Sequence, residues 1–235
     1  KPFLKAVDEK DVRIKFSLAW ANESWTNIWT GKPRTILVKQ EFPGKKDFED
    51  HFYTYLKAFQ DERYTRVNGK LLFGLFHPEF KNSKLFVDTW QNLAQKESLG
   101  EFLFMGFNRK RNDDGSQLHT NGIKRFVKIS PWPEVKYLPT ITDIVVRKLF
   151  SRKVDDILNE RPDVYNYQDY LNNALEQIHD LEYPVIVPNY DTTPRHGYRG
   201  MVLHEANPQS FEKVIIKALE VIKNRKAEEK IVLLK

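Results

Sequence analysis

Apolar residues gather in short runs along the chain, and the segments between these runs space their apolar residues as helices do. Each run is rich in β-branched, leucine or aromatic residues, a composition typical of buried strands. The pattern predicts strands at residues 12–20, 70–77, 101–107, 123–129, 183–187 and 231–234, with a further short strand at 35–40.

Helical spacing between these strands predicts amphipathic helices that cover a sheet. The stripe of Phe48, Phe52 and Phe59 predicts a helix over residues 47–60. Further stripes predict helices over 85–93, with Gly100 as a left-handed cap, over 170–178, and over 208–222, where Asn207 is the expected N-cap and Pro208 the first helical residue.

Strands that alternate with helices predict a parallel α/β sheet, either closed as a (β/α)8 barrel or open and doubly wound. A doubly wound sheet carries a glycine-rich phosphate loop after its first strand, and the chain has neither G-x-G-x-x-G nor a Walker sequence. We therefore expect a single TIM-barrel-like domain over residues 1–235, with a polar loop at about 108–122. Because the chain offers six or seven strands and stops on the strand sequence IVLLK, we expect this barrel to be incomplete at both ends.

Composition excludes several classes of protein. The 235 residues are 40% hydrophobic and include no cysteine, which excludes disulfides, thiol catalysis and thiolate metal sites but leaves the compartment open. No apolar stretch approaches the about 20 residues of a membrane helix, and the N-terminus lacks the apolar centre of a signal peptide. The formal charge of +6 is spread along the chain. Its densest cluster, 109–111, has no interleaved aromatic residues, so we do not expect nucleic-acid binding.

Two tryptophans and a carboxylate follow the first predicted strand in the sequence WANESW. An aromatic face covers the apolar C–H surface of a sugar ring, as Trp20 and Trp25 can do. Asn22 and Glu23 can exchange hydrogen bonds with the hydroxyls at its rim. Ordinary core packing is the alternative, and these six residues alone do not decide between the two.

The sequence VPNYDTTPRHG, at 187–197, forms a second candidate segment after a predicted strand. A carboxylate such as Asp191 can hold two adjacent sugar hydroxyls, and the guanidinium of Arg195 can bind a carboxylate or phosphate. The structural alternative is a turn in which Asp191 caps the backbone and pairs with Arg195.

His77 ends the strand predicted at 70–77 and, with Glu79, could line a site at the carboxyl end of the sheet. A strand end capped by Pro78 explains the same residues structurally. A lone His51 on the helix at 47–60 is more typical of a helix edge than of a ligand. The chain contains no G-x-S-x-G, H-E-x-x-H or D-x-D sequence and no histidine pair spaced for a metal, so we expect neither metal nor cofactor.

Four segments together resemble the WbsX-type glycosyltransferase family, whose domain is also described as glycoside hydrolase family 99-like. They are WANESW, Gln40 within VKQEF, residues 51–78, and YPVIVPNYDTTPRHG. They occur in the family's order and span most of the chain. Its D-N-T-P-R block is matched by Asp191, Thr193, Pro194 and Arg195, whereas Thr192 replaces the asparagine.

The resemblance implies a (β/α)8-like barrel that acts on glycans and is commonly encoded with genes for bacterial lipopolysaccharide or other surface polysaccharides. We therefore expect a cytoplasmic bacterial protein whose partner is a glycan or sugar donor. The residues expected to bind this substrate are Trp20, Asn22, Glu23, Trp25, Gln40, His77, Asp191, Thr193 and Arg195.

The resemblance also implies that the reacting carboxylates lie elsewhere. After the strand matching IVLLK the family continues into an N-E-W-x-E-G motif, so the catalytic pair is expected beyond Lys235, with Glu23 as an auxiliary candidate only. Transfer and hydrolysis share an oxocarbenium-like transition state. A family 99-like endo-acting glycoside hydrolase and a non-catalytic glycan-binding module therefore both stay open beside the glycosyltransferase.

Overall fold

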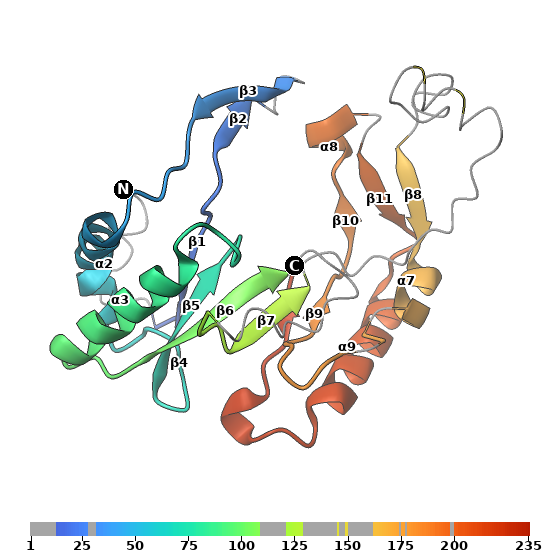
Figure 1. Cartoon of the computed structure of the whole chain (residues 1–235). Helices are drawn as coiled ribbons and strands as arrows, with labels where there is room; N and C mark the ends of the chain where they lie inside the picture. The colour runs from blue at the N-terminus through green and yellow to red at the C-terminus, as the bar shows by residue number, and fades with distance from the viewer. Residues whose placement is uncertain are drawn as a thin grey trace.

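The computed structural model describes residues 13–27, 32–108, 121–128, 145, 149, 162–173, 175–176, 178–197 and 200–235 (Figure 1). No helix among them is long and apolar enough to cross a membrane. The elements in chain order are β1 (Leu18–Trp20), β2 (Trp25–Asn27), β3 (Lys32–Val38), α2 (Lys45–Phe59), β4 (Arg66–Val67), β5 (Lys70–Leu75), α3 (Ser83–Lys96), β6 (Phe102–Asn108), β7 (Arg125–Lys128), β8 (Asp163–Asn166), α7 (Tyr167–Asn173), β9 (Val185–Ile186), β10 (Tyr190–Asp191), α8 (Thr193–His196), β11 (Met201–His204), α9 (Pro208–Ile222), the 3-10 turn η3 (Ala227–Glu229) and β12 (Leu233–Leu234).

Six of the described strands run parallel and lie side by side in the order in which the chain visits them. β1, β5, β6 and β7 form one sheet, and β9 pairs with β12. A parallel bridge between Phe126 and Glu182 joins β7 to the segment that leads into β9. The predicted α/β class with a parallel sheet is thus confirmed, without the reversal of strand order that marks a doubly wound sheet.

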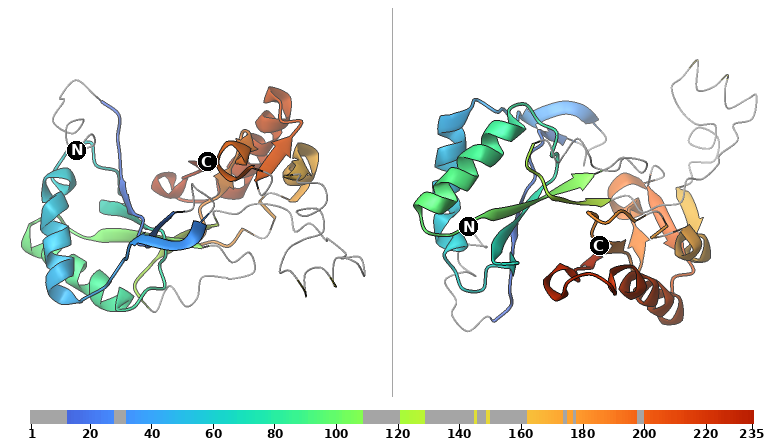
Figure 2. Two further views of the ribbon diagram at one scale, coloured as in Figure 1. Left: turned by 90° about the horizontal axis from the view of Figure 1, so that it is seen from above. Right: turned by 60° about the horizontal axis from the view of Figure 1, so that its bottom comes forward.

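The parallel strands are buried on both faces. Phe73 on β5 and Phe104 on β6 belong to an aromatic core with Trp90 of α3, on the face that α2 and α3 cover (Figure 2). Alternate side chains point the other way, as the strand geometry requires. They form a second apolar cluster that contains Val67, Leu72, Leu103, Met105, Val127, Tyr183 and Val185. Burial on both faces explains why these strands are nearly continuous apolar runs in the sequence.

The remaining strands form smaller units. β8, β10 and β11 make a three-stranded sheet, in which β11 is parallel to β8 and antiparallel to β10, and β2 and β3 form a hairpin. These strands, apart from β3 near the predicted 35–40, were missed because they are too short or too polar to show an apolar run. The first predicted strand was too long, because only residues 18–20 form β1 while Phe16 makes a single bridge to Tyr64. Most of the polar loop predicted at 108–122 lies outside the described residues.

The last helix begins as predicted. The side chain of Asn207 accepts a hydrogen bond from the Ser210 N–H at 2.9 Å, and Pro208 is the first residue of α9. The predicted helix over 170–178 was misplaced. α7 starts earlier, after Asn166, whose side chain accepts from the Gln168 N–H at 2.7 Å, and it ends at Asn173. The apolar spacing did not reveal this earlier start. The signal in the sequence was the asparagine at 166, a residue type that often caps the start of a helix.

The left-handed cap of α3 lies two residues earlier than predicted. Ser98, with φ of 58°, takes the left-handed position that was expected at Gly100. The N–H of Leu99 donates to the Ala94 carbonyl at 2.8 Å and the N–H of Ser98 donates to that of Gln95 at 3.0 Å, which is the Schellman pattern. Gly100 has φ of 86° and turns the chain toward β6 instead.

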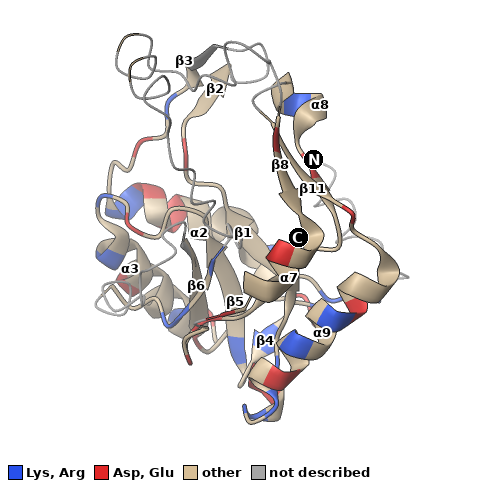
Figure 3. Ribbon diagram, turned by 90° about the vertical axis from the view of Figure 1, so that its right-hand side faces the viewer, with Lys and Arg blue, Asp and Glu red and all other residues tan. Residues whose placement is uncertain are grey.

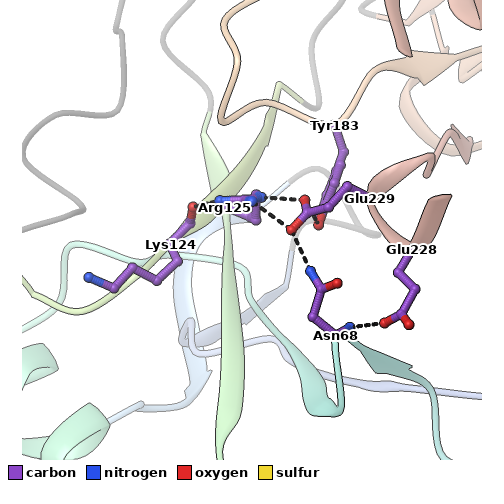
Figure 4. Close-up of polar contacts among 6 residues, drawn as sticks. All are labelled: Asn68, Lys124, Arg125, Tyr183, Glu228 and Glu229. Carbon is purple, nitrogen blue, oxygen red and sulfur yellow. Dashed lines mark hydrogen bonds and ion pairs between the residues drawn. The ribbon is translucent and has the colours of Figure 1, made fainter. Parts of the chain in front are cut away.

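Glu229 fastens the amino ends of several parallel strands (Figure 4). Its carboxylate accepts two hydrogen bonds from Arg125, at 2.7 and 2.9 Å, one from Asn68 at 2.9 Å and one from the Tyr183 hydroxyl at 3.1 Å. Arg125 begins β7, Asn68 precedes β5, Tyr183 precedes β9, and Glu229 itself precedes β12. The Arg125 and Glu229 side chains are only 20% and 15% exposed, so the pair is sheltered from water. The Glu229 carboxylate therefore links the amino ends of four strands that are distant from one another in the sequence.

Replacement of Gly74 by alanine is expected to lower the free energy of unfolding by about 1–3 kcal/mol, because a Cβ at this position would lie 2.8 Å from the Ala19 Cβ on the neighbouring strand. Denaturant unfolding measures this change. Adding Ala19→Gly removes the clashing methyl group, so the double variant should recover part of the loss. A double variant as unstable as the sum of both single variants would show that the contact is not the cause.

Glu229→Gln should destabilise the protein by about 1–3 kcal/mol, because it leaves the sheltered Arg125 without its charged partner. The matched control is Glu228→Gln, since exposed Glu228 contacts only the backbone N–H of Asn68 among the hydrogen bonds described for it. The control should change the free energy of unfolding by less than about 0.5 kcal/mol. Equal effects of the two substitutions would contradict the role given to Glu229.

Candidate functional site

Asn22 fastens the loop after β1 to the end of β5. Asn22 is only 3% exposed. Its Nδ2 donates to the His77 carbonyl at 2.7 Å, and its Oδ1 accepts from the His77 N–H at 2.7 Å. Both polar atoms of the amide are therefore used within the protein. This geometry gives Asn22 a positioning role, where the sequence suggested direct contact with a ligand.

The fastened loop places Glu23 beside the ring of His77. The Glu23 Oε2 and His77 Nε2 atoms are 2.9 Å apart, and the two side chains are 47% and 37% exposed. Both residues follow the carboxyl ends of neighbouring parallel strands, β1 and β5. A carboxylate and an imidazole in contact can both hydrogen-bond a bound hydroxyl and exchange a proton with it.

A pocket of about 300 Å³ adjoins Glu23. Trp25 on β2 pairs with Val38 on β3, so the indole lies beside the end of β3, and the Gln40 N–H donates to Ser24 Oγ at 3.0 Å. An indole, an amide and a carboxylate around one pocket suit a sugar ring. The lining residues are Ala21, Glu23, Trp25, Val38, Lys39 and Gln40.

The β2–β3 hairpin exposes apolar side chains on both its faces. The exposed fraction is 70% for Trp25, and Ile36, Leu37 and Val38 are all more than half exposed. Consecutive residues of a strand point to opposite faces, so exposure of Ile36 and Leu37 together means that neither face of β3 is covered. Val38 and Lys39 belong to the pocket but were missed in the sequence, although Gly31 and Pro33 between two strand-like runs are a hairpin signal.

Trp20 lies on the helix face of β1 and is not among the residues that line this pocket. Its ring contacts those of Phe42, His51, Phe80 and Phe86 at centroid distances of 4.7 to 5.8 Å. These contacts assign Trp20 to the core behind the strand, the packing alternative that the sequence left open. Sequence position alone did not separate Trp20 from Trp25.

His51 is a packing residue of the same core. Its ring lies between Trp20 and Trp90, at 4.7 and 5.2 Å. Burial lowers the pKa of His51 to about 4, against an opposing effect of Asp47, so the ring is neutral at physiological pH. A neutral imidazole can remain in an aromatic core without a counter-charge.

Asp191 and Thr193 form a tight turn at the start of α8. The Asp191 Oδ1 accepts from the Thr193 hydroxyl and from the Thr193 N–H, both at 2.7 Å. These two hydrogen bonds hold the pKa of the exposed Asp191 below its usual value. Arg195 follows within α8, and its N–H donates to the Thr192 carbonyl at 3.0 Å. The capping turn expected at Asp191 is therefore present, whereas its expected pairing with Arg195 stays a prediction. The Asp191 carboxylate is ionised at neutral pH.

The two candidate segments extend from the same end of the molecule. The β2–β3 hairpin, which follows Glu23, and α8, which follows Asp191, both lie at the top of Figure 1 and of Figure 3.

Charges of both signs are interspersed over α2, α3 and α9 in Figure 3. Within the described part of the chain, no group of three or more His, Cys, Asp or Glu side chains could hold a metal ion.

One solved structure, described as a glycoside hydrolase-like protein, is similar to this chain with a TM-score of 0.50 at 14% sequence identity. The similarity covers 83% of this chain and 51% of that one, so the chain spans about half the length of the protein it matches. At this identity the similarity concerns the fold alone. No curated protein matches the chain in sequence.

The sequence model of a protein family described as Glycosyltransferase WbsX matches residues 1–235. This match covers the whole chain and agrees with the resemblance seen in its motifs. The chain therefore belongs to the WbsX glycosyltransferase family, a family of carbohydrate-active proteins.

Proposed function

We propose that this chain is the core of a carbohydrate-active enzyme that forms or remodels glycosidic bonds in a bacterial surface polysaccharide such as lipopolysaccharide, as a WbsX-like glycosyltransferase. The observation that carries the proposal is the Glu23–His77 pair beside the Trp25 pocket, at the carboxyl ends of adjacent parallel strands. Active sites of (β/α)-barrel enzymes are built at this end of the strands.

The proposed scaffold is a (β/α)8-type barrel in one domain. Two features support it. The parallel strands follow one another in space in chain order, from β1 through β5, β6 and β7 to β9 and β12. They also share an apolar cluster on the face that α2 and α3 do not cover, as strands that curve around a common interior would.

Sugar binding in this proposal is divided between two segments. Glu23, His77, Trp25 and Gln40 bind one sugar, with the indole against the ring and the polar groups at its hydroxyls. Asp191, Thr193 and Arg195 contact another part of the substrate from α8. The ionised carboxylate of Asp191 accepts from sugar hydroxyls while Thr193 holds it in place. Asn22 and Trp20 support the first group from behind.

Hydrolysis is the second candidate reaction. Similarity of the fold to a glycoside hydrolase-like protein favours it, as does the absence of a D-x-D sequence for a sugar-nucleotide metal. In either reaction one group protonates the leaving oxygen and another assists attack at the anomeric carbon. The Glu23 carboxylate is proposed only as an auxiliary to such a pair.

Incubation of the full-length protein with activated sugar donors, and separately with an α-mannan, tests the reaction. A glycosyltransferase should consume donor and extend an acceptor, whereas a hydrolase should release oligosaccharide without any donor. Chromatography of the products separates these outcomes. Binding of a glycan without either product would contradict both enzymatic proposals and leave a glycan-binding module.

Glu23→Gln should weaken oligosaccharide binding about tenfold or more. A hydrogen bond to a charged carboxylate contributes about 1.5–3 kcal/mol, and the substitution replaces this acceptor by a neutral one of the same shape. Calorimetric titration measures the affinity. The matched control is Glu41→Gln, which removes an exposed carboxylate paired with Lys39 close to the same pocket. The control should leave affinity unchanged, and both variants should keep the stability of the parent. Unfolding of the Glu23 variant would instead support a purely structural role.

A further inference from the structure

Exposed apolar side chains are concentrated on the β2–β3 hairpin. Trp25 is 70% exposed, and Ile36, Leu37 and Val38 are 57%, 58% and 61% exposed. Trp25 pairs with Val38 across the hairpin, so the four side chains belong to one patch. Single exposed apolar residues are normal on a protein surface, whereas a contiguous patch marks a surface that contacts a partner.

Neither face of this ribbon is covered. Three consecutive residues of a strand cannot all point to one side, so the exposure of Ile36, Leu37 and Val38 leaves both faces of β3 open to solvent. In the described part of the chain β3 pairs with β2 alone, so its outer edge is open as well. A flat partner, such as a sugar ring or the face of another sheet, covers one side of a ribbon. A fluid phase that surrounds the ribbon covers both sides.

The charged residues of the hairpin all have one sign. The sequence from 25 to 39 contains Lys32, Arg34 and Lys39 and no aspartate or glutamate. The Lys39 side chain is 68% exposed, and its partner Glu41, at 2.9 Å, lies outside this segment. The segment therefore complements an anionic surface. A second copy of the hairpin would bring like charges together, which opposes pairing of two copies.

Tryptophan, aliphatic and basic residues on one exposed segment suit the boundary between a membrane and water. An indole prefers the level of the lipid headgroups, and aliphatic side chains gain by leaving water there. Basic residues add attraction to anionic lipids. The open edge of β3 limits the depth, because hydrocarbon cannot satisfy backbone N–H and C=O groups. The hairpin therefore suits the headgroup region, where water and headgroups supply hydrogen bonds.

The position of the hairpin allows such a contact. The β2–β3 hairpin extends from the body of the molecule at the top of Figure 1 and of Figure 3. Trp25 and Val38, at its base, also line the pocket beside Glu23. A surface that receives the hairpin therefore comes close to this pocket.

We propose that the β2–β3 hairpin docks the protein on an anionic lipid surface, with Ile36 and Leu37 among the headgroups and the basic residues of the segment attracting the lipid phosphates. Such docking goes beyond the proposed function, because it requires neither a sugar nor a reaction. It brings the pocket beside Glu23 to the membrane surface without any helix that spans the membrane.

Flotation of the full-length protein with lipid vesicles tests the proposal. One set of vesicles is phosphatidylcholine with about one-third phosphatidylglycerol, and the other is phosphatidylcholine alone. At low salt the protein should bind the anionic vesicles at least about tenfold more tightly than the neutral ones, and binding should weaken as the salt concentration rises. Absence of binding to the anionic vesicles at low salt would overturn the proposal.

The double variant Ile36→Gln/Leu37→Gln removes apolar surface without a change of charge, and it should weaken binding to the anionic vesicles about tenfold. Neither residue lines the pocket beside Glu23. The matched control is Ile216→Gln/Leu219→Gln on α9, where both residues are 54% exposed, and it should leave vesicle binding unchanged. Thermal unfolding verifies that both variants are folded. Equal vesicle binding by the two variants would overturn the role of the hairpin.

The double variant Lys32→Gln/Arg34→Gln tests the electrostatic part. It should weaken binding to the anionic vesicles about tenfold and make binding less dependent on salt. The matched control is Lys45→Gln/Lys46→Gln, which removes two exposed lysines of α2 that pair with Glu49 and Asp50. An equal loss of binding in the control would show attraction by the overall charge and not by the hairpin.

Other partners of the hairpin would give different results. For an interface between copies, sedimentation velocity would show a dimer of the parent that Ile36→Gln/Leu37→Gln converts to monomer, and vesicles would not bind. For a further sugar-binding surface, the same variant would lose affinity for oligosaccharide, again without vesicle binding. Either result would overturn membrane docking. Failure of the sugar-donor and α-mannan experiments would count against the proposed function and not against this inference.

Discussion

Burial of the parallel strands on both faces is the constraint on which the rest of the structure depends. Every residue of β5 from Leu71 to Leu75 is buried, and successive side chains enter different clusters. Leu71, Phe73 and Leu75 pack toward α2 and α3, and Leu72 packs on the opposite face. A shift by one residue would exchange these two sets, so the register and the position of each strand end are strongly specified. The carboxyl ends that carry the candidate site are located by this packing.

The site adds one polar link to that framework. Alternation along β1 places Leu18 and Trp20 in the aromatic core, so Ala19 approaches Gly74 on the other face. Beyond the end of β1, the Asn22 side chain makes two hydrogen bonds with the backbone of His77. These bonds join the two loops as backbone hydrogen bonds join neighbouring strands. Glu23 and His77 meet because their loops are held, and neither side chain has to be buried. A contact of this kind stays accessible to ligand and still has a defined geometry.

The sequence predicted the long periodic elements. Three of the residues that it singled out, Glu23, Trp25 and Gln40, line one pocket of the structure. The pattern of apolar residues repeats over several helical turns in α2 and α9 and over several pairs of residues in β5 and β6. These four elements were therefore predicted. Asn22 could not be recognised as an internal link, since its partner lies 55 residues away and is backbone rather than side chain. Trp20 and Trp25 have the same side chain, and only the end of β1 between them decides which one enters the core. β8, β10 and β11 are held by pairing with one another, which no local pattern records.

The two-sided exposure of the β2–β3 hairpin has a consequence for handling the molecule in solution. In the described part of the chain β3 pairs with β2 alone, and its residues from Thr35 to Val38 are uncharged, mostly β-branched and exposed. Such a ribbon is a template for edge-to-edge association, which can proceed to ordered fibrils when concentrated. The charges at this ribbon are Lys32 and Arg34 within β3 and Lys39 directly after it, and Lys39 is paired with Glu41. Charged residues that flank an apolar strand oppose its association, and high ionic strength screens them, so a concentrated preparation is expected to stay in solution better in dilute buffer.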